Sequence, residues 1–115
     1  MARRQRQRQK LTAPTSDYTG SGGDVLTLRG SLTPATRLEY TRLFEGGLHR
    51  EDAWARALEF LFERLAVAWT IAGVRTDRQK ELLARYRMAS AAERQFVRDA
   101  VRAHVEANFP ELTAP

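Results

Sequence analysis

The chain has 115 residues and no cysteine, which bounds it to one domain and excludes disulfides, thiolate metal sites and a cysteine nucleophile. Its formal net charge of +5 is confined to the first ten residues, where five of the 19 Lys and Arg residues lie without an acid. The 14 that remain are matched by 14 Asp and Glu. The protein is therefore a neutral body with a cationic arm, and we do not treat it as a basic domain.

Residues 1–23 predict a disordered basic arm followed by a Gly/Ser linker, because they cannot bury enough apolar area to offset the entropy of ordering. The arm is a candidate contact for nucleic-acid phosphates or for an acidic protein surface, since each cation adds a salt-sensitive increment to such binding. A solvated tail that only keeps the chain soluble explains the same composition equally well. The candidate contact residues are Arg3, Arg4, Arg6, Arg8 and Lys10.

Asp24–Arg29 is the one strand that the pattern predicts, and Gly30 ends it. Leu26 and Leu28 share one face of this strand. A single strand needs a partner, which is either another chain or a strand that the sequence pattern hides. We therefore expect a homo-oligomer, and the two leucines are candidate interface residues.

The second of four predicted helices begins near residue 50 and ends at Gly73. Its main apolar face is formed by Trp54, Leu58, Leu61, Leu65 and Trp69. Phe60 and Phe62 lie off this face. A small body covers only part of its apolar surface, so these two phenylalanines join the candidate interface residues.

The other three predicted helices are recognised by their first residues. One begins at Thr33, an N-cap followed by proline. The last two begin with capping boxes at Thr76–Gln79 and Ser90–Glu93. The expected fold class is mainly α: one short N-terminal strand, then four helices, in a single domain of residues 24–110, with residues 111–115 as a tail.

No arrangement of residues in the sequence predicts catalysis. His104 lies among apolar residues on a helix face, where a histidine is more often packed than ligating, and His49 lies at a helix start. Gly20–Gly23 precedes a strand, so it lacks the strand–loop–helix context of a phosphate-binding loop. We expect no enzymatic activity, no metal and no cofactor.

Membrane insertion and secretion are not expected either. The longest apolar stretch, Leu65–Ala72, is too short to span a bilayer. The basic start is not followed by the apolar segment of a secretory signal. The expected location is the cytoplasm.

Several features from residue 24 to about residue 109 occur together in one protein family. A strand ending in Leu28-Arg29 leads into a Thr-Pro helix start, and a long Ala/Leu/aromatic helix ends in Val67-Ala68-Trp69-Thr70-Ile71 before a glycine turn and two short amphipathic helices. This pattern resembles tail assembly chaperones of long-tailed bacteriophages. The resemblance implies a small, helical, non-enzymatic protein made in the host cell cytoplasm. It also implies two partners: the tape-measure protein, which such chaperones hold soluble, and the tail-tube protein, which they deliver to it.

A second pattern covers residues 24–65. Val25-Leu26-Thr27-Leu28-Arg29 and the stretch from Gly47 to Leu58 are similar to the ribbon, and to the turn and second-helix start, of ribbon-helix-helix DNA-binding proteins. That resemblance implies a transcriptional regulator in which Thr27 and Arg29 face the bases and the arm reaches the DNA backbone. Three features count against this resemblance. The apolar Val25 would face the groove without reading a base, the body has no net charge, and the helices after residue 65 have no counterpart in that family.

The sequence thus supports a first hypothesis, a non-enzymatic phage tail assembly chaperone-like protein that binds other proteins. The alternative is a DNA-binding regulator with a basic N-terminal arm. A third reading is an RNA-binding arm on a structural body.

Overall fold

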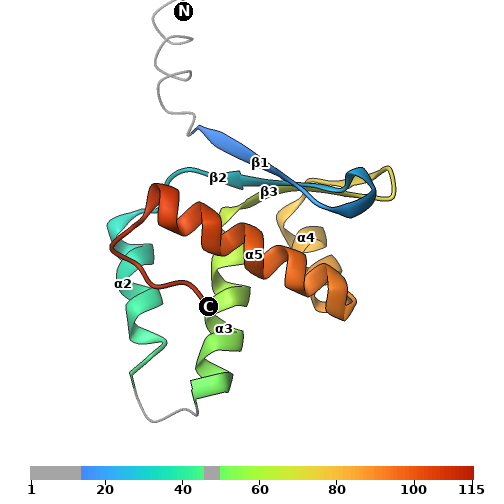
Figure 1. Cartoon of the computed structure of the whole chain (residues 1–115). Coiled ribbons are helices and arrows are strands. Elements are labelled where there is room, and N and C mark those ends of the chain that lie inside the picture. The colour runs from blue at the N-terminus through green and yellow to red at the C-terminus, as the bar shows by residue number, and fades with distance from the viewer. Residues whose placement is uncertain (1–13, 46–49) are drawn as a thin grey trace, which may run out of the picture.

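The computed structural model describes residues 14–45 and 50–115, which form a four-stranded antiparallel sheet and four helices (Figure 1). The strands are β1 (Thr15–Thr19), β2 (Val25–Arg29), β3 (Ala66–Ile71) and β4 (Val74–Thr76). The helices are α2 (Pro34–Arg42), α3 (Arg50–Leu65), α4 (Gln79–Arg87) and α5 (Ala91–Asn108), and a short 3₁₀ turn, η1 (Ser21–Gly23), joins β1 to β2.

The predicted fold class, mainly α with one strand, is wrong. The predicted strand is β2, and it lies inside an α/β fold whose sheet has the order β1-β2-β3-β4. Tyr18 of β1 lies opposite Leu26, and Leu26 lies opposite Trp69 of β3. The strand therefore finds both of its partners in its own chain.

β1 lies within the stretch predicted to be a linker. Thr15–Thr19 contains one large apolar residue, Tyr18, so its composition resembles that of a loop. All five of its residues nevertheless pair with β2. Backbone pairing, rather than burial of its own side chains, makes this segment a strand, and composition carries no signal for that.

β3 occupies the end of the predicted second helix. The helix ends at Leu65 and the strand begins at Ala66 without a loop, so the helix prediction is wrong from residue 66 onward. A short apolar run does not distinguish a buried helix from a buried strand. Val67, Thr70 and Ile71 are β-branched and favour the strand, where their restricted side chains fit the pleat.

A tight two-residue turn joins β3 to β4. Ala72 and Gly73 both have positive φ, 50° and 80°, as the hairpin turn that matches the twist of its strands requires. The carboxylate of Asp24 accepts the Ala72 N–H at 3.0 Å and holds the turn against the start of β2.

The helices lie on one side of the sheet: α5 runs across it, whereas α3 stands on it and continues into β3 (Figure 1). The core lies between these layers. Its largest fully buried side chains are Trp69, Tyr40, Phe62, Phe109, Leu26, Leu28, Leu61 and Leu65. The other side of the sheet carries short polar groups, such as Thr27, whose hydroxyl donates to Asp17 at 2.6 Å.

Two of the three predicted helix N-caps are confirmed. The Thr33 side chain accepts a backbone N–H at the start of α2. In the capping box of α5 the Ser90 hydroxyl accepts the Glu93 N–H at 3.1 Å, and the Glu93 carboxylate accepts the Ser90 N–H at 2.9 Å. The box predicted at Thr76 is wrong, because that residue belongs to β4 and α4 has no side-chain cap.

His104 joins α5 to the sheet, and it is fully buried. Its Nε2–H donates to the carbonyl oxygen of Arg29 at 2.7 Å, since a carbonyl can only accept. Nδ1 is then the acceptor for the Tyr18 hydroxyl at 2.8 Å. Burial lowers the pKa of His104, and the bond to the Arg29 carbonyl opposes this shift only in part. The neutral ring thus connects α5 to both β1 and β2.

We expect the free energy of unfolding to decrease as the pH falls below 6.5, the ordinary pKa of the His104 ring. Because the pKa of His104 is lowered in the folded state, the unfolded chain binds more protons than the folded one below pH 6.5. The stability that the neutral ring contributes above pH 6.5 is therefore lost as the pH falls toward the pKa of the folded state. His104→Gln should lower the melting temperature near neutral pH, because a flexible amide does not hold both of the buried hydrogen bonds of the ring, and each unmade one costs about 1–3 kcal/mol. Calorimetry between about pH 5 and 7.5 should also show a flatter pH dependence for this variant than for the parent chain.

Glu93→Gln is the matched control for this pH dependence. A hydrogen bond from Arg85, with a further one from the Ser90 backbone, lowers the pKa of Glu93 from 4.5, so its contribution is lost only below that pH. An unchanged slope above pH 5 in His104→Gln would contradict the role assigned to the histidine.

Candidate protein-binding surface

The interface residues predicted from the sequence do not lie together on the surface. Leu26, Leu28 and Phe62 have no exposed area and belong to the core. An interface through them would require the chain to open. Phe60 is half-buried at the edge of the core, with the guanidinium carbon of Arg64 5.1 Å from its ring centre.

The residues predicted to read DNA lie in a sheet that is too wide for that task. A two-stranded ribbon fits the major groove, which is about 12 Å wide, whereas four strands about 4.8 Å apart do not. Beside Thr27 lies the carboxylate of Asp17, which repels phosphates, and the guanidinium of Arg29 donates to the Arg64 carbonyl oxygen at 3.3 Å. The geometry of β2 therefore gives the ribbon-helix-helix interpretation no support.

The basic arm lies outside the described residues, so its contacts with phosphates or with an acidic partner stay predictions. They concern Arg3, Arg4, Arg6, Arg8 and Lys10.

Charged side chains, partly exposed aromatic rings and concave surface occur together around the C-terminal segment, residues 109–115. From the end of α5 this segment runs past α2 and back toward α3 (Figure 1). Phe109 is fully buried at its start, and Pro115 is buried at its end. The sequence placed residues 111–115 outside the domain, whereas the structure packs them against the helices.

Side chains from two helices hold the backbone of the C-terminal segment. The Tyr40 hydroxyl of α2 donates to the carbonyl oxygen of Thr113. Burial raises the pKa of Tyr40 to about 12, so the phenol stays protonated and remains a donor at neutral pH. On the other side, Arg102 Nε of α5 donates at 3.1 Å to an oxygen of Pro115, which belongs to the terminal carboxylate of the 115-residue chain.

Two hollows flank the C-terminal segment and share Thr113. The larger, of about 740 Å³, lies between α3, α5 and the end of the segment, and is lined by Glu51, Trp54, Ala55, Arg98, Arg102, Thr113, Ala114 and Pro115. The smaller, of about 180 Å³, lies beside α2 and is lined by Tyr40, Thr41, Phe44, Glu111, Leu112 and Thr113.

An aromatic pair connects the two hollows. The rings of Phe44 and Trp54 meet edge to face with their centres 5.3 Å apart. Phe44 lines the smaller hollow and is 41% exposed, while Trp54 lines the larger one and is half-buried. Partly exposed aromatic rings beside hollows are typical of protein-binding surfaces, where such residues act as anchors.

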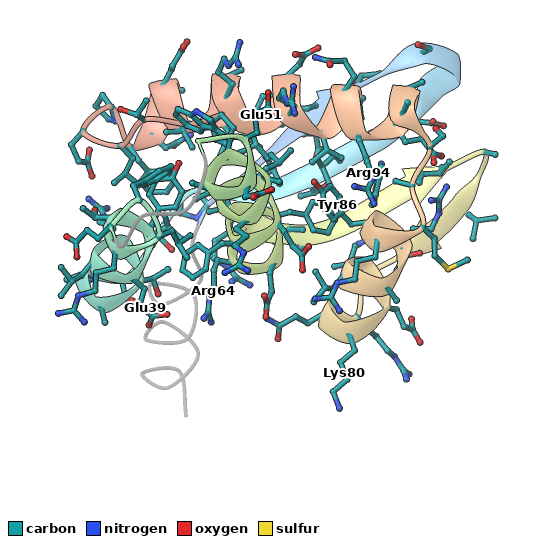
Figure 2. All side chains as sticks on the ribbon, turned by 90° about the horizontal axis from the view of Figure 1, so that it is seen from below. Glu39, Glu51, Arg64, Lys80, Tyr86 and Arg94 are labelled. Atoms are coloured by element: carbon teal, nitrogen blue, oxygen red, sulfur yellow. The ribbon has the colours of Figure 1, made fainter. Side chains whose placement is uncertain are left out.

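The two helices bring opposite charges to the larger hollow. Arg98 and Arg102 come from α5, and Glu51 comes from the first turn of α3, on the side that faces α5 (Figure 2). The lining side chains therefore carry two cations and one anion, and the terminal carboxylate of Pro115 adds a second anion beside Arg102. The charges of the hollow balance, and Arg98 is its cation without a hydrogen bond or ion pair to any described residue.

Sequence reasoning missed most of this surface. The spacing of Trp54 predicts a place on the apolar face of a helix, and residues 111–115 are predicted to be a tail outside the domain. One signal was available: Arg94, Arg98 and Arg102 recur every four residues, which places three cations on one face of α5.

No family model matches the chain, and neither a curated protein nor a solved structure is significantly similar to it. Within residues 14–45 and 50–115, no three His, Asp or Glu side chains gather in a way that could hold a metal ion. No helix in this part of the chain has the length and apolar content needed to cross a bilayer.

We expect Tyr40→Phe to loosen the C-terminal segment while leaving the core intact, because it removes the hydroxyl and keeps the ring. The loss of one hydrogen bond, about 1 kcal/mol net, should speed local opening about fivefold. Native-state amide exchange at Leu112, whose N–H bonds to the Phe109 carbonyl at 2.9 Å, measures that opening. Amides in the middle of α5 are the internal control, and equal acceleration there would show that the whole fold had been weakened instead.

Proposed function

We propose that the protein is a non-enzymatic assembly chaperone, of the type that phage tail assembly chaperones represent. The observation that carries the proposal is the partly exposed pair Phe44–Trp54 between two hollows. An exposed aromatic anchor next to concave surface suits a protein that holds another protein's apolar segment away from water.

The clients follow from the sequence resemblance: the tape-measure protein and the tail-tube protein, met in the cytoplasm of an infected host cell. Of the interface residues predicted from the sequence, Leu26, Leu28 and Phe62 lie in the core and Phe60 is half-buried at its edge. We therefore propose that the clients bind at the surface around the C-terminal segment, which offers accessible aromatic rings.

Self-association remains part of the proposal, by a different route. β2 is paired on both sides, so it cannot recruit a second chain. β1 is an edge of the four-stranded sheet and can extend it by backbone pairing with another copy.

Co-expression with the tape-measure protein from the same genome tests the proposed function. The chain should raise the soluble fraction of that protein, and Phe44→Ser should reduce the effect strongly, since truncation of an interface anchor costs at least about 2 kcal/mol, or about 30-fold in affinity. Co-purification through the client's tag measures the same interaction directly.

Met88→Ser is the matched control, because Met88 is 82% exposed and lies at the end of α4, outside both hollows. It should behave like the parent chain. Equal loss in both variants, or a client that stays insoluble with the parent chain, would contradict the proposal.

A further inference from the structure

We propose that the larger hollow, between α3 and α5, binds an acidic segment of a partner protein, in which a carboxylate side chain neighbours an apolar one. This inference rests on the proposed protein-binding function and names the chemistry of the partner.

Arg98 is the cation best placed to receive a carboxylate. It is exposed, lines the hollow and makes no hydrogen bond or ion pair with any described residue. Its neighbour one turn earlier is engaged: Arg94 lies over the Tyr86 ring, 5.3 Å from its centre, and donates to the Arg87 carbonyl oxygen at 2.8 Å (Figure 2). Of the arginines on this face of α5, Arg94 is thus fixed to the body, whereas Arg98 faces the hollow without a partner among the described residues.

Arg102 adds a second, partly engaged cation. Its Nε–H is donated to the terminal carboxylate of Pro115, which orients the guanidinium at the rim of the hollow. A guanidinium has five N–H donors in a planar fork, so four remain for a ligand. Arg98 and Arg102 are one turn apart and can approach the same carboxylate, which Arg residues bind in a bidentate manner.

Most of the remaining lining is apolar: Trp54 and Ala55 come from α3, and Ala114 and Pro115 come from the C-terminal segment. Glu51 and Thr113 are its other polar members. A partner that offered only negative charge would leave this part of the lining exposed to water. The complementary ligand therefore carries an aliphatic or aromatic side chain for the Trp54 side and a carboxylate for the α5 side.

The C-terminal segment forms one side of the hollow through Thr113, Ala114 and Pro115. Arg102 holds its end, and Tyr40 holds the Thr113 carbonyl oxygen from the side of the smaller hollow. A peptide thus already packs against α5 at this place, which favours a second peptide segment, lying beside the first, over a compact small molecule.

Glu51 favours a protein over a nucleic acid. It lies on the α3 side of the hollow, opposite the arginines. A phosphate backbone, which is anionic along its whole length, would meet this carboxylate, whereas a peptide can place its acid on one side only.

The test uses the full chain and a short fluorescent peptide in which each leucine is followed by a glutamate, with glycine and serine between the pairs. Fluorescence anisotropy should show binding that weakens with salt, and the glutamine version of the peptide should bind at least about tenfold more weakly. Arg98→Glu should cause a comparable loss with the acidic peptide. Arg98→Gln should be intermediate, because it removes the cation without adding an anion.

Lys80→Glu is the matched charge control. Lys80 is exposed on α4 and points away from the body, so the variant changes the net charge equally without touching the hollow (Figure 2). It should alter affinity less than about twofold. Circular dichroism and melting temperature verify that all three variants are folded.

Several outcomes would overturn the inference. Equal effects of Arg98→Glu and Lys80→Glu would mean that the peptide responds to net charge or binds the basic arm. Equal affinity for the glutamine peptide would remove the role of the carboxylate. Binding of a short labelled RNA or DNA duplex that is tighter than that of the acidic peptide, and that Arg98→Glu abolishes while Lys80→Glu retains, would assign the site to nucleic acid.

The two proposals fail separately. If Arg98→Glu still solubilises the tape-measure protein and the acidic peptide does not bind, the inference about the partner's chemistry is wrong while the chaperone function stands. If the peptide binds through Arg98 but the client is not solubilised, the surface binds proteins of another kind and the chaperone function is wrong.

Discussion

The direct passage from α3 into β3 determines where every other part of the binding surface lies. No loop separates Leu65 from Ala66, so the direction of α3 is fixed by the direction in which β3 enters the sheet. α3 therefore stands on the sheet, while α5 lies across the sheet beside it (Figure 1). The angle between these two helices leaves a space that neither can fill, and the C-terminal segment closes only part of it.

α5 must be held in place for that space to have a constant shape. His104 does so with a neutral ring that is bonded to β2 at one nitrogen and to β1 at the other. Both bonds lie on the sheet side of α5, so the opposite side of the helix is free to carry arginines. The buried side of α5 thus fixes the position of the helix on the sheet, and its exposed side carries the arginines that line the hollow.

The parts of this fold that were predictable from sequence are those with a local cause. The Ser90–Glu93 box and the Thr33 cap involve neighbours in the chain, and packing of His104 follows from the apolar residues beside it. β1 and β3 have no such local cause. Thr15–Thr19 is a strand only because β2 offers its edge, and Ala66–Ile71 has a composition that both a helix and a strand accept.

The same distinction explains why the site was hard to predict. Arg98 and Arg102 are visible in the sequence as part of a four-residue repeat, yet their value depends on Trp54 and on the C-terminal segment, which are distant in the chain. Charge counting also obscured them, because the net charge of the body is zero and the excess cations of the chain are all in the arm. Binding depends on the charges that converge on one hollow, and there Arg102 is engaged by Pro115 while Arg98 has no partner among the described residues. A neutral domain can thus have a strong preference for acidic partners without being a basic protein.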